Sequence, residues 1–201
     1  MVRIKFCGLT APADMEAVNE LHPDYIGFVF WKNSRRYVDP KTATGLKAML
    51  HADILTVGVF VDEEQAVVAD LLNSKVIDIA QLHGHEDGAY IASLRKLSPA
   101  PIIQAFKICR PSDLERAMAS KADYILFDSG AGTGKAFDWS LLNSFDRPFF
   151  LAGGLDLENI NKAIHHFHPF ALDVSSGIET NGKKDKEKMA AFIAAVRKEE
   201  V

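Results

Sequence analysis

The feature of this sequence that most limits its fold is a series of short apolar runs. Each run is followed by a polar or glycine-containing junction and then by a segment with helical spacing. Continuous apolar strands separated by helices are typical of a parallel sheet that is covered on both faces. Eight such units permit ring closure, so the sequence predicts an α/β fold, a single (β/α)8 TIM barrel of eight parallel strands over residues 1–201. The runs are Val2 to Phe6, Tyr25 to Phe30, Ile54 to Val61, Val76 to Leu82, Pro101 to Phe106, Tyr124 to Phe127, Pro148 to Ala152 and Phe170 to Val174.

An open, doubly wound sheet is the alternative arrangement of the same elements. No GxGxxG motif opens a helix after the first run, which disfavours a dinucleotide-binding version of that alternative. Asp62 before Gln65 and Ser112 before Glu115 have capping-box spacing, and we expect helices to begin there. The clearest helix is the last one, in which apolar residues recur at i, i+3, i+4 and i+7: Met189, Phe192, Ile193 and Val196.

The net charge and the cysteine content limit the classes of function that the protein can have. The formal net charge is −4 and there is no long basic run, which disfavours a nucleic-acid or anionic-membrane surface and favours a small-molecule substrate. Cys7 and Cys109 stand far apart, which argues against a disulfide scaffold or a structural metal site. Arg3 and Lys5 interrupt what would be the core of a signal peptide, and no apolar run approaches the ~18 residues of a membrane helix. We therefore expect a cytoplasmic protein.

In a TIM barrel the active site is built where strands end, and two such positions carry reactive groups. Cys7 ends the first run and is either a buried small apolar residue or a base or nucleophile. Lys5 lies on the same side of that strand, roughly 7 Å away, and a neighbouring cation lowers a thiol pKa, so we hypothesise thiolate chemistry. Asp128 follows an apolar run and is either a turn carboxylate or a functional acid.

The last two junctions predict a phosphate site. Gly153-Gly154 and Ser176-Gly177 offer backbone N–H groups at positive helix ends, in the place where TIM barrels commonly bind phosphate. The alternative is that these glycines only permit tight turns. Two such junctions together favour phosphate binding.

Three further features of the sequence have a structural explanation as well as a functional one. Arg36 is either a solvated loop charge or a fork for a substrate carboxylate. The histidines around His83 and around His165 to His168 lack a supporting set of carboxylates or lie far from the expected site, so we expect no metal. Gly132 to Lys135 resembles part of a P-loop without its first glycine, because position 128 is Asp, and we expect a loop over the site.

Eight motifs span nearly the whole chain: Lys5 to Thr10, Ser34 to Arg36, Val57 to Val61, Gln81 to Gly84, Phe127 to Ser129, Gly132 to Trp139, Ala152 to Leu155 and Asp173 to Glu179. Together they resemble the motifs of phosphoribosylanthranilate isomerase. That family consists of (β/α)8 barrels of tryptophan biosynthesis. The resemblance implies conversion of N-(5-phosphoribosyl)anthranilate to 1-(2-carboxyphenylamino)-1-deoxyribulose 5-phosphate by an Amadori rearrangement, with no cofactor and no metal.

The resemblance also implies roles for individual residues. Asp128 would be the general acid that protonates the ribose ring oxygen, and Cys7 the general base that removes the C2 proton. Arg36 would hold the anthranilate carboxylate, Asp173 the sugar hydroxyls, and His83 would line the pocket. The phosphate would be bound by Gly153, Gly154, Ser176 and Gly177.

Two other functions stay open on the sequence. One is a different phosphosugar barrel, although an epimerase would need metal ligands and a related synthase would need a catalytic lysine and glutamates at strand ends. The other is a noncatalytic phosphosugar-binding protein, which would tolerate loss of Cys7 and Asp128. The sequence leaves the oligomeric state undetermined.

Overall fold

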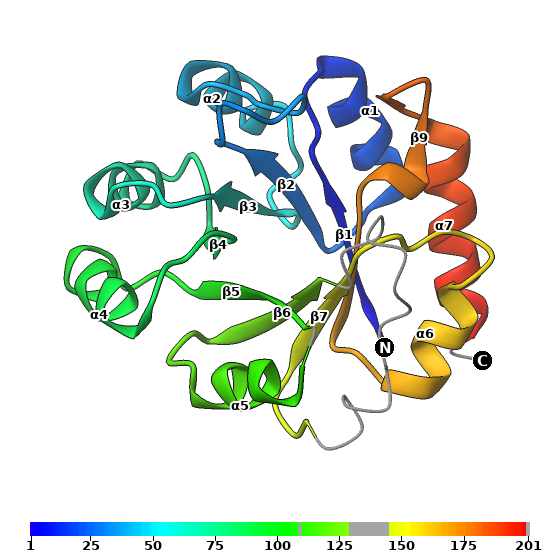
Figure 1. The fold of residues 1–201 in the computed structure, drawn as a ribbon. Helices are drawn as coiled ribbons and strands as arrows, with labels where there is room; N and C mark the ends of the chain where they lie inside the picture. Colours follow the sequence, from blue (N-terminus) through cyan, green and yellow to red (C-terminus); the bar gives the residue numbers. More distant parts are fainter. Residues whose placement is uncertain (109, 129–144, 200–201) are drawn as a thin grey trace.

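Eight parallel strands form a closed barrel in sequential order from β1 to β8 (Figure 1). The structure is a computed structural model and describes residues 1–108, 110–128 and 145–199. It confirms the predicted TIM barrel, and each strand begins and ends within three residues of the limits of its predicted run. The strands are β1 (Arg3–Cys7), β2 (Tyr25–Val29), β3 (Leu55–Phe60), β4 (Ile79–Leu82), β5 (Ile102–Lys107), β6 (Tyr124–Asp128), β7 (Phe149–Ala152) and β8 (Ala171–Val174).

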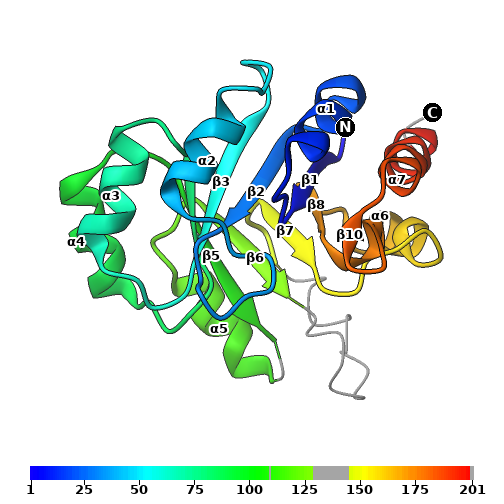
Figure 2. The ribbon, with the colours of Figure 1, turned by 90° about the horizontal axis from the view of Figure 1, so that it is seen from above.

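Helices surround the barrel strands, as Figures 1 and 2 show from two directions. After β8 the chain forms a short 3-10 helix, η2 (Ser176–Ile178), and a small hairpin of β9 (Glu179–Thr180) and β10 (Lys183–Lys184). The predicted loop at Gly132 to Lys135 lies outside the described residues. The helices are α1 (Pro12–Leu21), α2 (Pro40–Lys47), α3 (Gln65–Asn73), α4 (Gly88–Leu97), α5 (Pro111–Ala119), α6 (Ile160–Phe167) and α7 (Lys186–Lys198).

Two apolar clusters hold the barrel together. The larger cluster lies between the strands and the helices. The smaller one fills the barrel interior, where the Tyr25 and Phe150 rings meet edge to face at 5.5 Å. A parallel strand buries both of its faces in this way, which explains the continuous apolar runs of the sequence. The smaller cluster comprises Tyr25, Val57, Ile79, Ile103, Leu126, Phe150, Ala152 and Ala171.

The last helix has the predicted amphipathic pattern. All four residues of its apolar stripe are buried in α7, and Phe192 meets Phe6 of β1 edge to face at 6.2 Å. The Asp185 carboxylate caps the helix by accepting hydrogen bonds from the backbone of Glu187 and Lys188. No helix within the described ranges is both long and apolar enough to cross a membrane.

Both predicted capping boxes are wrong. Helix α3 begins at Gln65 with Glu64 as its N-cap, and α5 begins at Pro111 with Arg110 as its N-cap. Asp62 instead accepts a hydrogen bond from the backbone of His85, at 2.6 Å, and ties the loop after β3 to the loop after β4. Spacing alone could not show that a contact between two loops uses the Asp62 carboxylate.

Candidate active site

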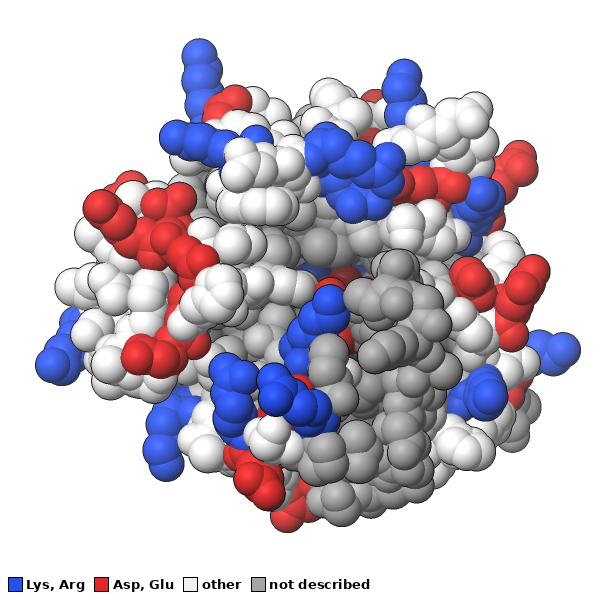
Figure 3. Space-filling model, in the orientation of Figure 1, with Lys and Arg blue, Asp and Glu red and all other residues white. Residues whose placement is uncertain are grey.

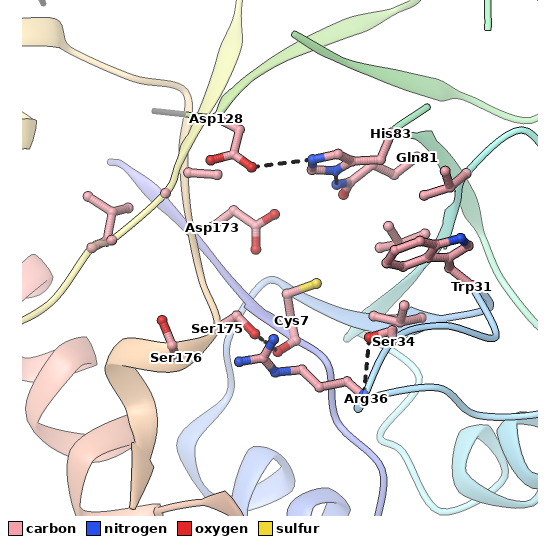
Figure 4. A pocket seen from close by; sticks show the side chains of 17 residues that line it. Cys7, Trp31, Ser34, Arg36, Gln81, His83, Asp128, Asp173, Ser175 and Ser176 are labelled. Atoms are coloured by element: carbon pink, nitrogen blue, oxygen red, sulfur yellow. Dashed lines mark hydrogen bonds and ion pairs between the residues drawn. The ribbon is translucent and has the colours of Figure 1, made fainter. Parts of the chain in front are cut away.

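The site is a pocket of about 470 Å³ at the carboxyl ends of the barrel strands (Figure 4). It receives side chains from strands that are far apart in the sequence, as expected for a TIM barrel. Gly177 is the one predicted site residue that does not line it. The predicted site residues that do line it are Cys7, Arg36, His83, Asp128, Gly153, Gly154, Asp173 and Ser176.

A buried ion pair lies below the pocket. Lys5 and Asp173 are register partners on β1 and β8, and their Nζ and Oδ2 atoms are 2.7 Å apart. Burial lowers the pKa of Lys5. The charge of Asp173 and the hydrogen bond to it raise that pKa by more than burial lowers it, so the net shift is upward. The Oδ1 atom of Asp173 is buried with no hydrogen-bond partner among the described residues. One oxygen of this carboxylate therefore has an unused capacity to accept a hydrogen bond.

The thiol of Cys7 is held at the end of β1. Burial raises its pKa, and the charges of Lys5 and Lys184 only partly oppose that effect. Lys5 does lower the pKa of Cys7, as hypothesised from the sequence, but burial outweighs this effect and the charge of Asp173 opposes it, so the net shift is upward. The raised pKa favours the neutral thiol over the thiolate.

Gly27 of β2 leaves room for these two side chains. A Cβ atom placed on it would lie 2.8 Å from Cys7 Sγ and 3.2 Å from Lys5 Nζ. Real Cβ atoms essentially never approach other atoms at the first of these distances, so a larger residue would push the sulfur aside. Gly27 was not identified from the sequence.

Asp128 lies across the pocket from Cys7. It ends β6, and strands β7 and β8 separate it from Cys7 on β1. The Oδ2 atom of Asp128 is 3.3 Å from Nε2 of His83, and the other ring nitrogen of His83 is 3.0 Å from the amide nitrogen of Gln81. Figure 4 shows this chain of contacts at one edge of the pocket. Gln81 thus orients a histidine toward the predicted acid.

Arg36 reaches the pocket from the loop after β2, and its side chain is 23% exposed. Its Nε and Nη2 atoms donate hydrogen bonds to the two carboxylate oxygens of Glu179, at 2.7 and 3.1 Å. Burial would raise the pKa of Glu179, but hydrogen bonds from Arg36 and Lys184 lower it to about 2. Glu179 is therefore ionised and holds the guanidinium by a two-point contact.

The predicted phosphate junctions differ from one another. Gly153 and Gly154 have φ values of 91° and 64°, which other residues rarely adopt. They do not begin a helix, since α6 starts only at Ile160, so the expected helix dipole is absent at this junction. Ser176 does begin η2. A Cβ atom on Gly177 would overlap the carbonyl oxygen of Leu155, so Gly177 allows the two junctions to approach closely.

Several functional residues were missed by the sequence analysis. Trp31 directly follows the second predicted strand and forms an apolar wall of the pocket with three valines, Val29, Val59 and Val61. Its position after a strand could have suggested this role. Glu179 stands in a motif noted in the sequence, but its partner Arg36 is too distant in the chain for spacing to reveal the contact.

Basic side chains lie at the edges of a central hollow on the face shown in Figure 3.

Among the described residues, one group could hold a metal ion: His22, His51 and Asp53, whose ligand atoms lie within 4.8 Å of one another. These residues precede β2 and β3, at the opposite end of the barrel from the pocket. His165, from the second histidine cluster of the sequence, does not belong to this group, and its ring contacts the carboxylate of Glu199.

A closed (β/α)8 barrel that gathers a thiol, carboxyl groups and an arginine in one pocket at its strand ends is a barrel enzyme for a small anionic substrate. A sequence model of the family described as N-(5'phosphoribosyl)anthranilate (PRA) isomerase matches residues 4–195. The chain therefore belongs to the N-(5'-phosphoribosyl)anthranilate isomerase family, which confirms the family suggested by the sequence motifs.

Individual relatives agree with this assignment. The N-(5'-phosphoribosyl)anthranilate isomerase of Endomicrobium trichonymphae is 41% identical, and the match covers 98% of this chain and 99% of that protein. The crystal structure of the enzyme from Thermotoga maritima has a TM-score of 0.90 and 36% identity, over 98% of this chain and 100% of the other. A phosphoribosyl anthranilate isomerase solved in complex with reduced 1-(o-carboxyphenylamino)-1-deoxyribulose 5-phosphate has a TM-score of 0.88 and 35% identity. This match covers 98% of this chain and 100% of the other.

Proposed function

We propose that this chain converts N-(5'-phosphoribosyl)anthranilate to 1-(2-carboxyphenylamino)-1-deoxyribulose 5-phosphate, with Asp128 as general acid and Cys7 as general base. The observation that carries these roles is that one pocket holds both groups, on strands separated by two others. An Amadori rearrangement moves hydrogens within one molecule, so an acid and a base on opposite sides of the sugar can drive it. The ligand named for a solved relative, a reduced form of this product, supports the same substrate class.

In the first step, Asp128 gives its proton to the ribose ring oxygen. The bond between that oxygen and C1 breaks, and the nitrogen lone pair forms a protonated Schiff base at C1. His83 lies 3.3 Å from the Asp128 carboxylate that remains and can donate a hydrogen bond to it through Nε2. The contact with Gln81 holds the ring in this orientation.

In the second step, the thiolate of Cys7 removes the proton from C2. The released electron pair forms the C1–C2 double bond of an enolamine and neutralises the nitrogen, and the enolamine then tautomerises to the aminoketose. Lys5 and Lys184 stabilise the thiolate, because both of their charges lower the pKa of Cys7. Their effect offsets part of the penalty for a buried anion.

Other residues hold the substrate in place. Arg36 binds the carboxylate, Oδ1 of Asp173 accepts a hydrogen bond from a sugar hydroxyl, and the wall formed by Trp31 contacts the aromatic ring. His83 also lines this space. A phosphate bound far from C2 positions the sugar against Cys7, so that binding energy contributes to the rate. The proposed phosphate ligands are Gly153, Gly154, Ser176 and Gly177.

We further propose that residues 1–201 form one domain and that the protein works in the cytoplasm. The pairing of β1 with β8, which joins the first and last strands of the barrel, supports a single domain. The membership in a family of biosynthetic enzymes supports the location.

The decisive experiment follows the loss of anthranilate fluorescence with freshly generated substrate. Wild type is compared with Asp128→Asn and Cys7→Ser, which keep size but remove the acid and weaken the base. We expect turnover by wild type and a fall of several orders of magnitude in both variants, since groups that act as a unit have large individual effects. No turnover by folded wild type would refute the activity, whereas active variants would refute only the assigned roles.

A further inference from the structure

Glu179 is a buried carboxylate at the start of β9 that contacts three cations. Its side chain is 5% exposed and accepts hydrogen bonds from Arg35, Arg36 and Lys184. A buried carboxylate requires such partners, because burying an unpaired charge is strongly unfavourable. Three positive charges around one negative charge leave a net positive charge beside the pocket.

The contacts of Arg36 divide its guanidinium into two edges. The edge with Nε and Nη2 faces Glu179, and Nη1 donates no hydrogen bond to any of the described residues. The stem of the side chain lies against Gly8, where an added Cβ would overlap Arg36 Cδ. Arg36 also lines the pocket, so its second edge is available to an anion there.

Lys184 links this cluster to the strand that carries the thiol. Its Nζ atom is 2.9 Å from Glu179 and 2.8 Å from the carbonyl oxygen of Ser175. The Ser175 hydroxyl in turn donates to the carbonyl oxygen of Cys7, at 2.9 Å. Glu179 and Lys184 are register partners in the β9–β10 hairpin, so this small hairpin fixes both groups.

We propose that Glu179 is a positioning residue that holds Arg36 with one edge turned toward the carboxylate of the substrate. This inference rests on the proposed function and adds to it a residue that does not touch the substrate. A flexible arginine loses side-chain entropy when it binds, and a fixed partner reduces that loss. Glu179 thereby sets affinity for substrates that carry the carboxylate.

The first test uses Glu179→Gln, which keeps the shape but places an amide against Arg36. We expect KM to rise about 10- to 100-fold, as for loss of a hydrogen bond to a charged group, and kcat to change much less. In the Arg36→Ala background the same substitution should have little further effect. An equal rise in KM in both backgrounds, or no rise in wild type, would overturn the proposal.

The second test separates positioning from a general structural role. The reduced product analogue carries the carboxyphenyl group, whereas ribulose 5-phosphate does not, and both are measured as competitive inhibitors or by calorimetry. Glu179→Gln should weaken the analogue about tenfold or more and leave ribulose 5-phosphate within about threefold. Equal weakening of both ligands would show that Glu179 acts through the fold.

Two variants serve as controls. Arg35→Ala removes a cation that contacts Glu179 but does not line the pocket. The KM of this variant should therefore change by less than about threefold. If Glu179→Gln does not fold, Glu179→Asp keeps the charge on a shorter side chain and should show the same ligand preference in weaker form. The calorimetric comparison of the two ligands needs no turnover, so an inactive wild type would refute the proposed function independently of it.

Discussion

Lys5 and Asp173 form an ion pair of 2.7 Å between neighbouring strands, directly below the pocket. The Lys5 side chain is fully buried, and Asp173 uses only Oδ2 in this contact. The pair therefore serves both the barrel and the site. It neutralises a lysine inside an apolar interior and fixes the carboxylate whose other oxygen lacks a partner within the described part of the chain.

Lys5→Met should destabilise the protein by about 3–5 kcal/mol, because it leaves the Asp173 carboxylate buried without its cation. The double variant Lys5→Met, Asp173→Asn removes both charges and should recover a large part of that loss. Urea unfolding at pH 7 measures both free energies. A loss below about 1 kcal/mol in the single variant would show that the pair contributes little to stability.

The pH dependence of the reaction should report the raised pKa of Cys7. Burial disfavours the thiolate, so a higher pH is needed for a given thiolate fraction, and the rising limb of kcat/KM should lie above the ordinary range of cysteine. Lys5→Met removes a charge that lowers this pKa and should shift the limb further toward alkaline pH. A limb that stays in place would exclude an effect of Lys5 on the base.

A direct titration checks the assignment of that limb. The chain has two cysteines, so thiolate absorbance is measured in a Cys109→Ser background, where the signal comes from Cys7. The midpoint should agree with the kinetic limb of the free enzyme. Disagreement would assign the kinetic limb to another group.

The barrel and most of its site could be predicted from sequence because they depend on local patterns. Apolar runs mark strands, and a strand end such as Cys7 or Asp128 necessarily lies at the pocket face. The contacts that set the chemistry of those groups join distant residues. Nothing in the spacing indicates that Asp173 partners Lys5 or that Glu179 holds Arg36. The net upward shift of the Cys7 pKa, to which burial and Asp173 contribute, could not be predicted from spacing for the same reason.

The incorrect predictions have a related cause. Asp62 has the right spacing for a helix cap, but its carboxylate is used by His85 from another loop. The Gly153-Gly154 junction was expected to begin a helix, yet the turn after it continues to Asn159 before α6 starts. Local propensity does not determine which partner a polar group finds after the chain has folded.

Gly27→Ala should slow the reaction by displacing the thiol. The added methyl group would press on Cys7 Sγ, and a shift of about 1 Å in a catalytic group can reduce a rate by about 100-fold. We expect kcat to fall by at least about tenfold with a smaller change in KM, measured in the fluorescence assay. Gly45→Ala is the matched control, because the added Cβ would meet no heavy atom within 4 Å apart from its chain neighbours and the backbone of its own helix, α2. That variant should keep its kinetics and gain about 0.5–1 kcal/mol in stability.

The contribution of Glu179 to the stability of the fold should depend on pH. Burial opposes its ionisation, but Arg36 and Lys184 lower its pKa from the ordinary 4.5 to about 2 in the folded protein. A carboxylate with a lowered pKa stabilises the fold fully above its unfolded pKa and loses that contribution as the pH falls through the folded value. The difference in urea midpoint between wild type and Glu179→Gln should therefore be constant above about pH 5.5 and shrink toward pH 2. A difference that stays constant to the lowest pH at which both proteins fold would show that the charge of Glu179 does not stabilise the hairpin.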